Sequence, residues 1–148
     1  MSARRLIIIA ATALVLIGGA TQVHAAQKDK GQLPALVGDL NDAQLIEVRD
    51  QNGQVLLHGT LKTSSNKPNE TEREATLESP TGQKAEGEFE IEIEHKDGAT
   101  KEEIELSAKH LPAMTQCELF IDGRHVTTMT TSKSGKAEVK LKRKSGGK

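Results

Sequence analysis

The chain contains no tryptophan and no tyrosine, and its only phenylalanines are Phe89 and Phe120. Proteins that bind sugars or single-stranded nucleic acids usually stack aromatic rings on their ligands, and this chain has almost no rings to offer. Its formal net charge of −1 also provides no overall basic surface for a nucleic acid. We therefore expect a core of leucine, isoleucine and valine, and no nucleic-acid partner.

Cysteine is nearly absent as well, because Cys117 is the only one, which excludes a disulfide bond within the chain. A lone cysteine is a buried apolar residue, a bridge to another chain or a reactive thiol. Cys117 begins an alternating segment in which Leu119 and Ile121 are also apolar. We expect Cys117 to point into the core as an inert thiol.

Long apolar runs are absent except near the N-terminus. Residues 6–20 carry no charge, follow two arginines, and precede Val23 and Ala25, which occupy the −3 and −1 positions of a cleavage site. This order is typical of a secretory signal peptide. We predict a signal helix in residues 1–25 and an exported product, periplasmic or extracellular, without a transmembrane segment. An uncleaved anchor is the alternative, although the run is shorter than the roughly 20 residues of a spanning helix.

Most of the remaining chain alternates apolar and polar residues. In residues 88–94 every second residue is a glutamate, and Phe89, Ile91 and Ile93 lie between them. Such alternation is typical of a strand with one face on a core and the other in water. The pattern predicts strands over residues 46–48, 55–61, 88–94, 103–109, 117–121, 126–130 and 137–141.

Turn signals separate these segments, namely Asn52-Gly53, Asp97-Gly98, Asp122-Gly123 and Ser134-Gly135. Asn-Gly and Asp-Gly pairs tolerate the positive φ angles of tight hairpin turns. About seven short strands with frequent turns predict an all-β fold, a small antiparallel β-sandwich, with a small β-barrel as the alternative.

The expected domain covers residues 45–143 and follows an irregular segment at residues 26–44. Residues 62–74 are polar, contain Pro68 and carry mixed charge, so we expect a mobile loop there. Residues 144–148 are expected to form a disordered tail.

One part of the chain has a recognisable pattern. The stretch LPAMTQCELFIDGRHVTTMTTSKSGKAEV contains Leu-Pro, a strand that ends in Asp-Gly, a threonine-rich strand, a glycine turn and a last strand. It resembles a module that recurs in secreted bacterial β-proteins of unassigned function. The resemblance covers residues 101–142 and implies a sandwich fold and an envelope location, without catalytic residues to transfer.

Acidic and basic residues gather in two different parts of the chain. Alternate glutamates occupy residues 90–94 on one expected strand face, and alternate lysines occupy residues 140–144 on another. Opposite charges that face each other across strands stabilise by about 0.2–1 kcal/mol per pair, and like charges destabilise. We therefore predict that the 90–94 glutamates lie nearer to these lysines than to Glu103 and Glu105. The short link at 96–100 favours instead a hairpin between the two acidic strands. The lysine neighbour and this hairpin are compatible if residues 88–94 form the middle strand.

The sequence gives little support for a metal site or a catalytic site. His110, Met114 and Cys117 are potential copper ligands within one short stretch, but blue-copper proteins have the order Cys, His, Met. Glutamates on alternate positions of one strand are spread about 7 Å apart and converge poorly on calcium. No nucleophile elbow or other catalytic motif is present. We expect no metal, no cofactor and no enzymatic activity.

These observations predict an exported, non-enzymatic binding or structural module of the bacterial cell envelope. Its partner is expected to be a protein or an anionic envelope component, met through a sheet edge or through the basic last strand. The residues proposed for that contact are Lys140, Lys142, Arg143 and Lys144. The alternative is a periplasmic protein that binds a metal or small ligand through the loop from His110 to Cys117.

Overall fold

The computed structural model describes residues 28–146. The predicted signal helix and cleavage site lie outside these residues, as do the last two residues of the predicted tail. None of the helical structure in the described part is long and apolar enough to cross a membrane.

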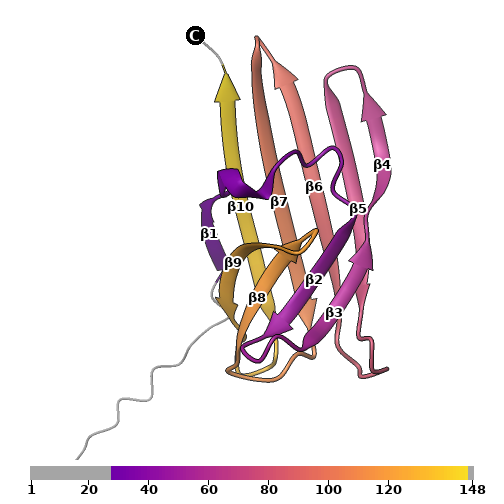
Figure 1. The fold of residues 1–148 in the computed structure, drawn as a ribbon, viewed down its shortest axis with the longest axis vertical. Coiled ribbons are helices and arrows are strands. Elements are labelled where there is room, and N and C mark those ends of the chain that lie inside the picture. The colour runs from indigo at the N-terminus through magenta and orange to yellow at the C-terminus, as the bar shows by residue number, and fades with distance from the viewer. Residues whose placement is uncertain (1–27, 147–148) are drawn as a thin grey trace, which may run out of the picture.

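The prediction of an all-β fold is confirmed (Figure 1). The strands are β1 (Lys28–Gln32), β2 (Leu45–Asp50), β3 (Val55–Thr60), β4 (Lys62–Lys67), β5 (Glu70–Glu78), β6 (Glu86–Lys96), β7 (Ala99–Lys109), β8 (Gln116–Ile121), β9 (Arg124–Thr130) and β10 (Ala137–Gly146), with one short 3-10 helix, η1 (Ala35–Val37). All seven segments predicted from alternation fall within or largely within strands of this set.

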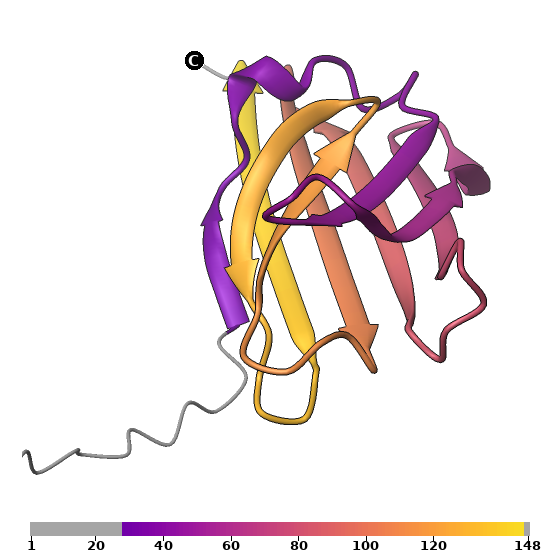
Figure 2. The same ribbon diagram turned by 60° about the horizontal axis from the view of Figure 1, so that its bottom comes forward.

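The strands form one continuous sheet in the order β1-β10-β7-β6-β5-β3-β2-β8-β9, with β4 paired to β5. The sheet curls into a half-barrel, so that β2, β3, β8 and β9 cross over β10, β7, β6 and β5 (Figure 2). The sandwich of seven strands expected from the sequence is not confirmed, since all ten described strands belong to a single hydrogen-bonded sheet.

The two halves of the sheet join at a corner between β3 and β5, where only His58 and Glu78 are paired. Gly59 sits at this corner, and a Cβ atom there would come within 2.4 Å of the carbonyl oxygen of Thr76. The missing side chain therefore allows the two halves of the sheet to approach closely. The core between them is aliphatic, as expected, with Phe89 as its only large ring.

Three segments differ from the sequence-based expectations. Residues 62–74, predicted as a loop, form β4 and the first half of β5, joined by a turn at Pro68 and Asn69. The irregular segment 26–44 contains β1 and η1, and residues 144–146 continue β10 instead of belonging to a tail. The loop prediction failed because Arg73 occupies a core-facing position of β5, where an apolar residue would have shown the alternation.

Residues 33–44, which we call the strap, run along one end of the curled sheet (Figure 2). The strap buries Leu33, Val37, Leu40 and Ala43 in the core. Three arginines from three different strands donate to its main-chain carbonyl oxygens: Arg73 to Leu40 and Asn41, Arg124 to Leu36 and Val37, and Arg143 to Pro34, Ala35 and Gly38. These side chains satisfy backbone acceptors that lack sheet partners.

Candidate functional site on the outer face of the sheet

The side of β5, β6 and β7 that points away from the core is covered with carboxylates. We call this surface the acidic face, and it comprises Glu70, Glu72, Glu74, Glu78, Glu86, Glu88, Glu90, Glu92, Glu94, Glu103 and Glu105. The residues between them along the strands, such as Ile91 and Ile104, are buried. One alternating pattern therefore builds the core on one side of the sheet and the acidic face on the other.

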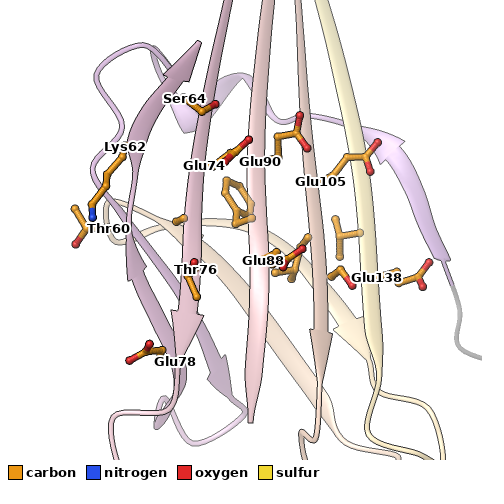
Figure 3. A pocket seen from close by; sticks show the side chains of 15 residues that line it. Thr60, Lys62, Ser64, Glu74, Thr76, Glu78, Glu88, Glu90, Glu105 and Glu138 are labelled. Atoms are coloured by element: carbon orange, nitrogen blue, oxygen red, sulfur yellow. The ribbon is translucent and has the colours of Figure 1, made fainter.

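The glutamates of the acidic face are in register with one another across the three strands. Glu90 lies between Glu74 and Glu105, as Figure 3 shows, and Glu92 is paired with Glu72 on one side and Glu103 on the other. The predicted proximity of the 90–94 glutamates to the lysines is therefore wrong, because β7 lies between β6 and β10.

The β6–β7 hairpin explains why the like charges face one another. Asp97 and Gly98 both have positive φ, at 51° and 74°, which is the geometry of a tight two-residue turn. This turn fixes the register, and slipping it by one residue would expose either Ile91 or Ile104. Burying one such side chain stabilises by about 1.5–3 kcal/mol, whereas a facing like-charge pair costs at most about 1 kcal/mol.

Lysines lie at the two edges of the acidic face. Lys62 on β4 is opposite Glu74, and Lys140 on β10 is opposite Glu105, so the row Glu74–Glu90–Glu105 begins and ends next to a lysine. The ammonium of Lys140 contacts the carboxylates of Glu103 and Glu105, and that of Lys142 is 2.7 Å from Glu103. Within residues 28–146, no ion pair reaches the middle glutamates, Glu90 and Glu92.

The pKa values of the glutamates depend on how far each carboxylate lies from the lysines at the edges of the face. Burial raises the pKa of Glu90 above its ordinary value, and the charges of Glu74, Glu72 and Glu92 raise it further. Burial also raises the pKa of Glu103, but hydrogen bonds from Lys140 and Lys142 outweigh it and hold the pKa below the ordinary value. Negative charge is thus least compensated in the middle of the face.

The acidic face is hollowed near the start of β6 and the end of β7. A depression of about 980 Å³ extends from β4 across β5, β6 and β7 to β10 (Figure 3). Its lining combines one lysine, Lys62, and several short side chains with the carboxylates of Glu74, Glu78, Glu88, Glu90, Glu105 and Glu138; the short side chains are those of Thr60, Ser64, Thr76 and Ser107. Short residues between long acidic ones leave space in which a ligand group can meet several carboxylates at once.

The four basic residues proposed from the sequence lie in different surroundings. Lys140 and Lys142 point to the outer face and are bound to glutamates of β7. Arg143 points to the opposite side, where it forms a two-pronged ion pair with Glu102, with Nε–Oε2 at 2.6 Å and Nη2–Oε1 at 2.9 Å. Lys144 is exposed and lies opposite Lys101. Arg143 is therefore part of the scaffold that holds the strap.

The proposed metal ligands lie before, within and after one turn, in the order His110, Met114 and Cys117. His110 and Met114 are exposed and have positive φ angles of 60° and 53°, whereas Cys117 is fully buried in β8. The burial expected for Cys117 is confirmed. Burial and the nearby charge of Asp50 raise the pKa of its thiol to about 11. Among residues 28–146, no group of three histidine, cysteine or acidic side chains is placed to hold a metal ion.

The sequence reasoning missed the β5 part of the acidic face. Glu72 and Glu74 fell within the predicted loop, although Ala75 and Leu77 continue an alternation that could have revealed the strand. Arg73 concealed it, since an arginine at a core-facing position is unusual unless it is paired. Here its guanidinium donates to the carbonyl oxygen of Asn41 at 2.8 Å.

Comparison of the chain with protein-family models, with curated proteins and with solved structures gave no match.

Proposed function

We propose that this protein is an exported, non-enzymatic binding module of the bacterial cell envelope, and that the acidic face binds a cationic partner. The observation that carries the proposal is the row Glu74–Glu90–Glu105, in which three carboxylates face one another beside the hollow. The export of the chain rests on the signal-like pattern of residues 1–25.

The uncompensated charge in the middle of the face favours a partner that brings cations. Glu90 has only glutamates as direct neighbours on β5 and β7, and its raised pKa reflects burial combined with like-charge repulsion. A lysine or arginine side chain that entered the hollow would relieve this repulsion and form charge-assisted hydrogen bonds. In this proposal the curled sheet serves as a sandwich-like scaffold that holds the glutamates in fixed register.

The contacts of the basic residues argue against β10 as an open surface for an anionic polymer. Lys140 and Lys142 would have to leave Glu103 and Glu105, or share them, before they could bind an external anion. The alternative metal or small-ligand site has less support, because Cys117 is buried while His110 and Met114 are exposed. We therefore place the cationic partner ahead of both alternatives.

The experiment that tests the proposal measures binding of the chain to immobilised polylysine and to immobilised polyglutamate, at low and moderate salt. We expect binding to polylysine that weakens as salt screens the charges. The double variant Glu74→Gln, Glu90→Gln should bind several-fold more weakly. The matched control is Glu118→Gln, which removes one carboxylate from β8, outside the acidic face. Equal losses in the control and the double variant, or preferential binding to polyglutamate, would refute the proposal.

A further inference from the structure

The first strand of the sheet is weakly attached to it. β1 lies at the edge next to β10, and theirs is the one parallel pair in the described sheet. Parallel pairing is slightly less stable per residue than antiparallel pairing. Lys30, Gly31 and Gln32 are all exposed, so these three residues bury no side chain. The hold on them comes mainly from the main-chain hydrogen bonds of the ladder.

Two central positions of β1 match β10 poorly, although Lys28 at its start lies opposite Glu138. Lys30 lies directly opposite Lys140, and Gly31 lies opposite Leu141, to which it offers no apolar side chain. Like charges that face each other across a pair destabilise it. On its other side Lys140 meets Glu105, an arrangement of opposite charges. An acidic residue in the place of Lys30 would extend this alternation of charge across the sheet.

The chain immediately after β1 is firmly held. The amide of Leu33 donates to the carbonyl oxygen of Lys142 at 2.9 Å, and the Leu33 side chain is buried. Arg143, itself paired with Glu102, binds the carbonyl oxygens of Pro34 and Gly38 in the strap. β1 can therefore leave β10 while the strap stays in place and the core stays closed.

We propose that the β10 edge is a docking site for an extended segment of a partner protein, which displaces β1 and alternates acidic with apolar residues. Its main chain would take over the hydrogen bonds of β10, as in other cases of strand addition to a sheet edge. Its acidic residues would lie opposite Lys140 and Lys142 and share their ammonium groups with Glu103 and Glu105, and its apolar residues would lie opposite Val139 and Leu141. This site is separate from the acidic face and selects the opposite charge.

The test uses fluorescence anisotropy with a short labelled peptide of alternating glutamate and valine. The comparison peptide alternates lysine and valine. The proposal predicts that the glutamate peptide binds the unmodified chain and the Glu74→Gln, Glu90→Gln variant equally well, whereas the lysine peptide, which meets the acidic face, binds the variant more weakly. No binding of the glutamate peptide would overturn the proposal while leaving the acidic face as the binding surface for cations, so the two proposals fail separately.

A reversible disulfide bond between β1 and β10 tests whether the peptide binds at the β10 edge. Gln32 and Lys142 are partners in the β1–β10 register, so the double variant Gln32→Cys, Lys142→Cys should form a disulfide that holds β1 in place. Oxidation should weaken binding of the glutamate peptide by about tenfold or more, because the open state becomes inaccessible. Reduction should restore binding, although to a level below that of the unmodified chain, because the variant lacks Lys142. Equal binding by the oxidised and reduced forms would show that the peptide uses another edge, such as that of β4 or β9, and would overturn the proposal.

A surface variant gives an independent check that does not depend on cysteine chemistry. Lys30→Glu replaces a like-charge pair with an opposite-charge pair against Lys140 and so strengthens the hold of β1. Binding of the glutamate peptide should weaken about threefold, and Lys30→Ala should have little effect or tighten binding slightly. Unchanged or tighter binding by Lys30→Glu, or no binding of the peptide to the unmodified chain, would overturn the proposal.

Discussion

Glu90 lies directly opposite Glu105 across the β6–β7 pair, so two residues of like charge face each other in the hairpin. The register is set by the Asp97-Gly98 turn and by the apolar residues on the inner side of the strands. Repulsion on the outer face is thus a consequence of the same pairing that builds the core. It gives the acidic face measurable properties.

Removing the charge of Glu90 should stabilise the fold. The variant Glu90→Gln keeps the size of the side chain and removes repulsion from Glu74, Glu72 and Glu92. We expect the free energy of unfolding to rise by roughly 0.5–1 kcal/mol, the scale of cross-strand pairs. Urea unfolding followed by circular dichroism measures this. Glu88→Gln is the matched control, because Glu88 faces Thr76 and Ser107 and should change stability less.

The stability of the protein should depend on pH in a non-monotonic way. The pKa of Glu90 is raised in the folded state, so its protonation favours folding, and stability should rise as pH falls from neutrality toward the ordinary carboxyl value of 4.5. The pKa of Glu103 is lowered, so the stability that it contributes is lost as the pH falls further, below 4.5. Urea unfolding across this range should show a maximum in mild acid. A Glu90→Gln variant that kept the full rise would contradict this account.

Arg143 should matter far more for stability than its neighbour Lys142. Arg143→Met leaves the buried carboxylate of Glu102 without its partner and leaves strap carbonyl oxygens without a donor. Breaking a buried pair in this way costs about 3–5 kcal/mol. Lys142→Met breaks only an ion pair with an exposed lysine, which costs less than about 1 kcal/mol. Thermal unfolding of the two variants compares them, and similar losses would refute the structural role of Arg143.

Cys117 should be unreactive in the folded protein. Its side chain is fully buried, and the pKa of its thiol is raised to about 11, so the nucleophilic thiolate is scarce at neutral pH. A thiol reagent should label it only after denaturant is added. Labelling of the native protein at the rate of a free thiol would contradict the buried position and reopen a chemical role for this residue.

Sequence alternation located the strands that carry apolar residues at every second position, such as residues 88–94 and 117–121. It failed for β5 because Arg73 takes a core-facing position, where it is stabilised by carbonyl oxygens of a segment distant in sequence. It also failed for β1, whose residues Lys30, Gly31 and Gln32 are all exposed and so leave no apolar pattern.

The order of the strands was harder to predict than their positions. The prediction from cross-strand charge set the glutamates of β6 beside the lysines of β10. Turn geometry and burial have larger effects on the free energy of folding, and they place β7 between β6 and β10. The acidic face could not be assembled without this order, because Glu72, Glu74, Glu103 and Glu105 come from strands on both sides of β6. The strap contacts were equally hidden, since main-chain carbonyl oxygens carry no sequence signal.

The most direct test of the acidic face is a nuclear magnetic resonance titration of the isotope-labelled chain with a short lysine peptide. We expect backbone amide shifts to concentrate on β5, β6 and β7 around Glu74, Glu90 and Glu105, and to shrink in the Glu74→Gln, Glu90→Gln variant. Shifts confined to β8, β9 or the strap, or shifts that persist unchanged in the variant, would contradict the claim that this face is the binding surface.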